Sequence, residues 1–421
     1  MNHPRPISRA RFFFSSGVFI ALNFLANLFE LGFNWVLIRL PEGEYSTFWA
    51  LFRIFFIIAA PLVAIQLVLG KEISSLIALR RYGAARFFAD RSLRYVAVAG
   101  AAMMCLGLAV SPLIAGFLRI HTVLPVIFVM LTIALYSPIP VFYGVIQGLK
   151  KFATLGAVTI CWGGGRFFLS LLLIVVFSAG LNGIMGAVIG AALFTILMAA
   201  IAARGVFSHP PEPMGAEEIR RAFTFIFPIA ATLYSITLMR GADGIFAKRF
   251  FAPAIADAYN LSATVGSAFF TLSGIFMVML PVVSEETTLN RNPIRFLLRS
   301  MFFTTVLSLA GIVAAWFFPG LVVTVMSAGK HIPAAEPLIR IVGITVLPSS
   351  LVYLIANYFL ARHIAGFLPV LVSGALLQVT FINLFRATPL SMLVAVGAAN
   401  TATLIGMIGY LWKKHREDIW V

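Results

Sequence analysis

Charge, and above all negative charge, is scarce in this sequence. Only 11% of the 421 residues are charged, and 15 Asp and Glu stand against 31 Lys and Arg, for a formal net charge of +16. An average soluble domain has about 25% charged residues. This scarcity excludes a soluble protein of this length, because such a protein could not cover its apolar residues with a polar surface.

Cysteines and catalytic motifs are also rare. The two cysteines, Cys105 and Cys161, lie in apolar runs, so we interpret both as small core hydrophobes. The sequence contains no P-loop, HExxH, CxxC or serine-nucleophile elbow. The glycine-rich stretch CWGGGRFF lies inside an apolar run, which predicts close helix packing or a local bend instead of a phosphate-binding loop. We therefore expect no enzyme, no metal site and no cofactor.

Apolar residues dominate, at 61% of the chain with a mean hydropathy of +1.00. A transmembrane helix needs about 20 predominantly apolar residues. The apolar runs of about this length occupy residues 12–39, 45–69, 95–118, 123–145, 154–177, 183–203, 222–246, 258–282, 297–318, 337–360, 365–385 and 389–411. The first run is longer than a signal-peptide core of about 7–15 residues. We predict an all-α polytopic membrane protein with about 12 transmembrane helices.

The basic residues are distributed unevenly along the predicted loops. Counted from the N-terminus, the odd-numbered segments between the apolar runs hold most of them, as at residues 80–94 and 413–416. The positive-inside rule then predicts that both termini are cytoplasmic. It also accounts for most of the positive charge without a nucleic acid partner.

The strongest linker signal is RGVFSHPPEPMGAEEIRRAF at residues 204–223, which divides the apolar runs six and six. It predicts an N-terminal lobe at residues 1–208 and a C-terminal lobe at residues 209–421. The two halves resemble each other where their first two helices meet, in VLIRLPEGEYSTFWALF and IFAKRFFAPAIADAYNLSA. This echo predicts two pseudo-symmetric six-helix lobes around a central cavity.

Two of the apolar runs carry a polar stripe with residues spaced by four, three and four positions. One stripe comprises Asn23, Asn27, Glu30 and Asn34. The other comprises Asn260, Thr264, Ser267 and Thr271. On an ideal helix this spacing places four side chains within about 60°. A polar face inside a membrane must meet protein or water, so we predict that both stripes line the cavity. Hydrogen bonding between packed helices is the alternative.

Further charged residues lie well inside predicted spans, namely Arg53, Arg166, Arg240 and Asp243. Arg340 lies within one turn of the end of its span, where its side chain can reach the membrane surface. Placing an arginine at the bilayer centre costs at least about 2.5–3.5 kcal/mol. Structural pairing of Arg53 with Glu30, and of Arg240 with Asp243, is left open by the sequence. Arg166 has no carboxylate at its depth in the predicted topology, so we expect it to face the cavity. With the pairs closed or open, the cavity is net cationic and suits an anion such as a phosphate.

Several segments resemble the polysaccharide-biosynthesis flippases of the multidrug/oligosaccharidyl-lipid/polysaccharide exporter superfamily. These segments are LIRLPEGEYSTFWAL, YGVIQGLKKF, GADGIFAKRFFAPAIADAYNLSA and VMLPVVSEE. The most specific part is the pattern Asp243, Tyr259, Pro281. The likeness extends over nearly the whole chain, although many members have additional C-terminal spans.

The resemblance implies alternating access and the flipping of polyprenyl-pyrophosphate-linked oligosaccharide, for surface polysaccharide or O-antigen assembly in a bacterial inner membrane. It implies that Arg53, Arg166 and Arg240 hold the pyrophosphate. Glu30 and Asp243 are the candidates for coupling to H⁺ or Na⁺, or for gating. Expected partners are membrane lipid, a polysaccharide polymerase and glycosyltransferases. Two other classes stay open: a cation-coupled multidrug exporter, and a non-transporting subunit of a glycan-synthase complex.

Overall fold

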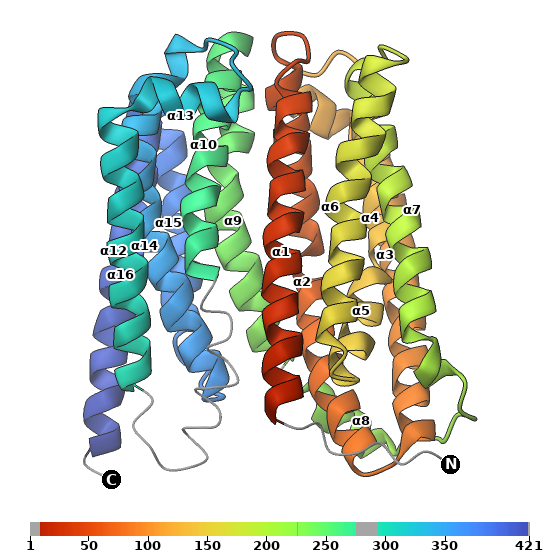
Figure 1. Ribbon diagram of the computed structural model, residues 1–421. Helices are drawn as coiled ribbons and strands as arrows, with labels where there is room; N and C mark the ends of the chain where they lie inside the picture. The colour runs from red at the N-terminus through yellow and green to blue at the C-terminus, as the bar shows by residue number, and fades with distance from the viewer. Residues whose placement is uncertain (1–8, 225, 275–293, 420–421) are drawn as a thin grey trace. The chain divides into compact units, whose positions relative to one another are not determined.

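The computed structural model describes residues 9–224, 226–274 and 294–419, and all regular structure in these ranges is helical (Figure 1). Nine helices within these ranges are long and apolar enough to cross a membrane. Helices suit this environment because they satisfy their backbone hydrogen bonds internally where no water is available. The predicted fold class, an all-α polytopic membrane protein, is confirmed.

The predicted apolar runs correspond to helices along the chain. The first half contains α1 (Arg9–Leu37), α2 (Glu44–Ala78), α3 (Tyr82–Leu118), α4 (Leu124–Tyr136), α5 (Ile139–Gly148), α6 (Phe152–Val175), α7 (Gly180–Phe207) and α8 (Ala216–Phe223). The second half contains α9 (Ile226–Phe250), α10 (Pro253–Gly274), α12 (Ile294–Phe317), α13 (Pro319–Met326), the 3₁₀ turn η2 (Pro333–Ala335), α14 (Glu336–Ala361), α15 (Leu368–Leu384) and α16 (Pro389–Ile419). The fourth predicted run is divided between α4 and α5, next to Pro138 and Pro140.

The chain forms two compact units. Unit 1 contains residues 1–40, 62–115 and 121–226, and unit 2 contains residues 41–61, 116–120 and 227–421. The predicted boundary at residues 208 and 209 differs from this partition, because residues 41–61 of the first half belong to unit 2. The arrangement of two lobes around a central cavity stays a prediction.

Each unit has its own central helix. In unit 1, α6 packs against α1 and α7, and α7 also packs against α4 and α5. In unit 2, α14 packs against α10, α12 and α16, and α15 packs against α16. The candidate site residues lie on α1 and α6 in unit 1, and on α9, α10 and the first half of α2 in unit 2.

The predicted linker is fixed to the start of α3. The rings of His209 and Tyr82 stack with centres 4.9 Å apart, and Arg86 donates a hydrogen bond of 2.5 Å to the carbonyl of His209. Arg81 is ion-paired with Glu218 of α8 at 2.7 Å. The proline-rich stretch therefore separates α7 from α8 while remaining part of unit 1.

Candidate functional site

Arg166 forms an ion pair with Glu30 inside unit 1. Its Nη2 donates to Oε1 of Glu30, and its Nε donates to the carbonyl of Trp162 at 3.4 Å. The Arg166 side chain is 2% exposed and that of Glu30 is 37% exposed. The expectation that Arg166 has no carboxylate at its depth is therefore wrong. The pairing of Glu30 with Arg53, which the sequence left open, is not formed. One helical turn spans about 5.4 Å. An error of a few residues in the predicted span boundaries therefore placed Glu30 and Arg166 at different depths.

Gly163 allows α1 and α6 to approach closely at this pair. A Cβ on Gly163 would lie 3.2 Å from the carbonyl oxygen of Ala26 and 3.5 Å from Oε1 of Glu30. A larger side chain would push α1 away from α6 and weaken the ion pair. The close packing predicted for CWGGGRFF is confirmed at this position.

Two aromatic rings add to the surroundings of the Arg166 guanidinium. Its Cζ lies 4.7 Å from the ring centre of Trp162 and 5.1 Å from that of Phe33. A cation over an aromatic face is stabilised by the ring quadrupole. Glu30 and the rings thus compensate the buried charge within unit 1. A substrate role for Arg166 stays a prediction, and it would require the pair with Glu30 to open.

Arg53 lies in unit 2, where it binds an amide instead of a carboxylate. Its Nη1 donates a hydrogen bond of 2.5 Å to Oδ1 of Asn260, which is fully buried. The amide nitrogen of Asn260 donates to the carbonyls of Ala256 at 3.0 Å and Gly244 at 3.3 Å. Asn260 thereby ties the first half of α2 to α9 and α10.

Two glycines of α9 make room for Arg53. A Cβ on Gly241 would lie 3.4 Å from Cβ of Arg53, and a Cβ on Gly244 would collide with the guanidinium itself. The arginine stem therefore runs along a glycine face of α9. Arg53 is 7% exposed, so a ligand could reach it only after this packing changed.

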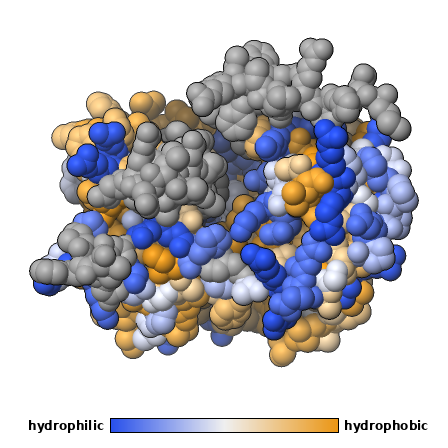
Figure 2. Space-filling model, turned by 90° about the horizontal axis from the view of Figure 1, so that it is seen from below, coloured by the Kyte–Doolittle hydropathy of each residue, from blue (hydrophilic) through white to orange (hydrophobic). Residues whose placement is uncertain are grey.

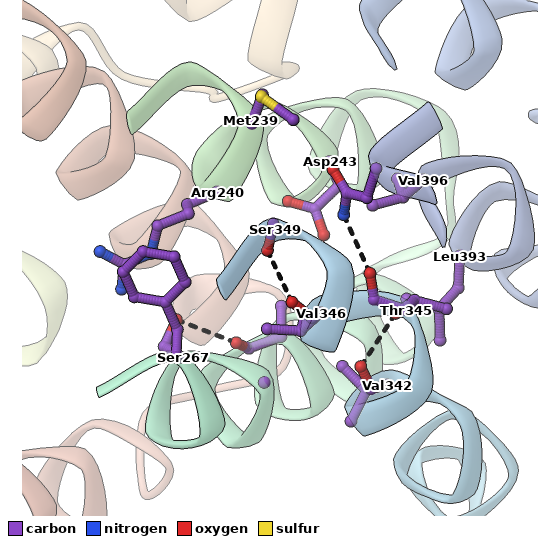
Figure 3. A pocket seen from close by; sticks show the side chains of 14 residues that line it. Met239, Arg240, Asp243, Ser267, Val342, Thr345, Val346, Ser349, Leu393 and Val396 are labelled. Atoms are coloured by element: carbon purple, nitrogen blue, oxygen red, sulfur yellow. Dashed lines mark hydrogen bonds between the residues drawn. The ribbon is translucent and has the colours of Figure 1, made fainter. Parts of the chain in front are cut away.

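Asp243 is hydrogen-bonded to an aromatic hydroxyl. Its Oδ2 accepts a hydrogen bond of 3.2 Å from the hydroxyl of Tyr259. Its Oδ1 is buried and accepts no hydrogen bond from the described residues. The ion pair between Arg240 and Asp243, which the sequence left open, is not formed, and Figure 3 shows the two side chains pointing in different directions from α9.

Arg240 is the most open of the three arginines. Its side chain is exposed, and its Cζ lies 3.9 Å from the ring centre of Phe270. The ring of Phe270 in turn lies 5.1 Å from that of Tyr353. Within the part of the chain that the structure describes, the Arg240 guanidinium forms neither an ion pair nor a hydrogen bond. An anion could therefore accept hydrogen bonds from these donors without displacing a partner among the described residues.

Arg240 and Asp243 line a small pocket in unit 2 between α9, α10, α14 and α16 (Figure 3). Its volume of about 30 Å³ admits one or two water molecules. The hydroxyls of Ser267, Thr345 and Ser349 donate to backbone carbonyls at 3.1, 2.9 and 2.7 Å. Within unit 2, the pocket thus combines one open cation with buried acceptor oxygens.

The polar stripe of α1 is graded in burial. Asn34 is buried, Asn23 and Glu30 are half-buried and Asn27 is exposed. Leu25 and Leu28 on the same helix are also exposed, at 39% and 48%. Polar and apolar side chains of α1 are thus exposed alike, and cavity lining by this stripe stays a prediction.

Part of the polar stripe of α10 packs against neighbouring helices. Asn260 is buried in the bonds described above, and Thr264 Oγ1 lies 3.4 Å from the hydroxyl of Tyr45. Ser267 lines the pocket. The side chain of Thr271, together with the predicted motif VMLPVVSEE and its Pro281, lies outside the described residues.

The architecture matches solved structures over almost its whole length. An inward-facing multidrug resistance MATE transporter of the MOP superfamily gives a TM-score of 0.75 at 15% identity, with 95% of this chain and 97% of that chain covered. A MOP superfamily transporter from Pyrococcus furiosus gives 0.68 at 15% identity, with 95% and 93% covered. The eukaryotic MATE transporter AtDTX14 gives 0.72 at 11% identity, with 97% of both chains covered.

The chain has the MATE fold. No protein-family model matches the sequence, and no curated protein matches it either. The likeness therefore lies in the arrangement of the helices, which the resemblance to the superfamily had implied.

Several residues that contact the candidate site residues or line the pocket were not predicted from the sequence. Phe270 stacks on Arg240, and Gly241 and Gly244 contact Arg53. Asn400 lines the pocket, and its Nδ2 donates to the carbonyl of Thr345 at 2.9 Å. Gln378 donates to the carbonyl of Met239 at 2.6 Å. A polar amide within an apolar run, as in α15 and α16, was the available signal for the last two.

Proposed function

We propose that this protein is a membrane transporter that moves a polyprenyl-pyrophosphate-linked oligosaccharide from the cytoplasmic to the outer leaflet by alternating access. The observation that carries this proposal is Arg240, an open guanidinium on a membrane-spanning helix. A guanidinium presents its donors in a planar fork that matches phosphate oxygens. Its position over Phe270 holds the fork in place without neutralising its charge.

The balance of charge within the two units supports an anionic cargo. In unit 1, Glu30 neutralises Arg166. In unit 2, the candidate site residues comprise two arginines, Arg53 and Arg240, and one acid, Asp243. An excess of intramembrane positive charge favours an anion and disfavours a cationic drug.

The similar structures support transport as the general activity. They include MATE transporters in an inward-facing and in an outward-facing conformation. The Pyrococcus furiosus protein is described as having a binding pocket of reverse polarity that suggests a different function. A MATE fold is thus compatible with more than one class of cargo, and the arginines decide our choice.

A cation-coupled multidrug exporter is the second candidate. The observation in its favour is the buried Oδ1 of Asp243, which accepts no hydrogen bond from the described residues. A buried acceptor of this kind suits a proton or a sodium ion. The same carboxylate serves the first proposal as the coupling group, with Glu30 as the gate partner of Arg166.

The proposed orientation places both termini in the cytoplasm of a bacterium, with the protein in the inner membrane. Figure 2 shows hydrophilic residues gathered on the end of the molecule that carries α8. On this end of unit 1, Arg80, Arg220 and Arg221 are exposed, as the positive-inside rule expects of a cytoplasmic face. Polymerase and glycosyltransferases are the proposed partners for surface polysaccharide or O-antigen assembly.

The deciding experiment compares two cargoes in one preparation of proteoliposomes. One assay follows the flipping of a fluorescent polyprenyl-pyrophosphate glycan, and the other follows efflux of a cationic dye. We expect glycan flipping that Arg240→Ala abolishes and Arg240→Lys partly retains. Arg340→Ala, at an exposed arginine of α14, is the control and should match the wild type. Dye efflux without glycan flipping would replace the proposal with the exporter.

A further inference from the structure

A carboxylate from α10 caps the first turn of α2. Oδ2 of Asp257 accepts the backbone N–H of Gly43 at 2.7 Å, and Oδ1 accepts that of Ser46 at 2.8 Å. The first N–H groups of a helix have no partners within the helix, and a negative charge there is favoured by the helix dipole. Such a cap normally comes from the residue next to the helix. Here it comes from a position 211 residues later than Ser46.

The carbonyl of Gly43 is held as well. Nζ of Lys248 on α9 donates to it at 2.9 Å. Gly43 has a φ of +83°, and a Cβ there would lie 2.9 Å from Cβ of Pro253. Only glycine fits this position without strain. We call the group of Gly43, Ser46, Lys248 and Asp257 the α2 clasp.

The clasp lies at the end of a helix that the two units share. Residues 41–61 belong to unit 2, and the continuation of α2 from residue 62 belongs to unit 1. Pro61 stands at this division inside α2. It lacks the N–H that would bond to the carbonyl of Ile57, so the helix is weakest here.

The other helix shared in this way has a similar weak point. Residues 116–120 belong to unit 2, although the preceding part of α3 belongs to unit 1. Pro112 lies inside α3, just before this division. In both helices a proline therefore accompanies the change of unit.

We propose that the α2 clasp is a conformational switch. It holds residues 41–61 in unit 2, and Pro61 is the hinge about which they move when the clasp opens. Its three hydrogen bonds are only partly buried, so water can replace them in the open state. The second polar tie, between Arg53 and Asn260, is buried and holds the same half-helix deeper in unit 2.

Distances between paired spin labels on the full chain in nanodiscs, with Cys105 and Cys161 replaced by alanine, test the proposal. One pair joins Phe56 on α2 to Leu376 on α15, and a reference pair joins Ile255 on α10 to Ile344 on α14. All four positions are exposed and lie in unit 2. We expect one population for both pairs in the wild type.

Asp257→Ala should add a second population to the Phe56–Leu376 pair and leave the reference pair unchanged. Asp257→Asn should add a smaller one, because its single carbonyl oxygen can still accept one of the two N–H groups. Gly43→Ala should act in the same direction through strain at Gly43. The control Glu42→Gln changes an exposed acid beside the clasp and should have no effect.

Two results would overturn the switch. If Asp257→Ala leaves both distance distributions unchanged, the clasp does not decide where the half-helix lies. If both pairs broaden together, Asp257 supports the fold of unit 2 and switches nothing. Neither reading depends on the cargo, so failure here leaves the proposed transport activity intact.

Discussion

Arg166 of α6 is ion-paired with Glu30 of α1, 136 positions away in the chain. The pair joins the intramembrane arginine of unit 1 to the carboxylate of the α1 stripe. Because Arg166 is paired, Arg240 is the arginine whose guanidinium is open to an anion. The pair also predicts how the loss of either partner changes the stability of the protein.

Glu30→Gln should destabilise the protein, because it leaves the buried Arg166 without its counter-charge. Breaking a fully buried pair costs about 3–5 kcal/mol, and the cost is smaller here because Glu30 is 37% exposed. Thermal unfolding in detergent, followed by fluorescence-detected size exclusion, measures the effect. The double variant Glu30→Gln with Arg166→Met should recover most of the loss. No recovery in the double variant would show that the two side chains act independently.

Gly244→Ala should lower stability, since the added methyl collides with the guanidinium of Arg53. Overpacking of this kind typically costs about 1–3 kcal/mol. Gly186→Ala on α7 is the matched control, because nothing lies within 4 Å of a Cβ there. The control should be neutral or slightly stabilising, since alanine favours a helix more than glycine does. Equal melting temperatures for the two variants would contradict the conclusion that Gly244 makes room for Arg53.

Phe270→Leu should weaken anion binding by Arg240 while leaving the fold in place. A cation–π contact contributes about 0.5–2 kcal/mol, so we expect a loss of about 2-fold to 30-fold in affinity. Titration of the purified protein with a short-chain prenyl pyrophosphate gives the measurement, and Phe270→Tyr should retain wild-type affinity. Unchanged affinity in Phe270→Leu would mean that the ring does not position the guanidinium.

Single cysteines on the α1 stripe should report whether its polar face meets water. Asn23→Cys and Asn27→Cys should react with a membrane-impermeant thiol reagent, whereas Leu25→Cys and Leu28→Cys should not. Thiol reaction requires water at the sulfur, so it separates a hydrated face from a lipid-facing one where exposure does not. Similar labelling at all four positions would remove the prediction that the stripe lines a cavity.

The sequence by itself determined the fold class, the approximate positions of the spans and the membrane environment. Hydropathy is a local property that about 20 consecutive residues reveal, and the runs at 154–177 and 337–360 accordingly match α6 and α14 closely. The close packing at Gly163 could also be foreseen, because small residues on a transmembrane helix let a neighbouring backbone approach closely.

Only the tertiary structure decided which charged side chains meet. Arg53 binds Asn260 and not Glu30. Asn260 and Glu30 are both polar residues of predicted spans, so the sequence offered each as a partner for Arg53. Pairing depends on the rotation and depth of each helix relative to its neighbour. A shift of one residue turns a side chain by about 100°, and a shift of one turn moves it by about 5.4 Å. Hydropathy does not fix either quantity, whereas the packing of α9 glycines against Arg53, and of α1 against α6, fixes both.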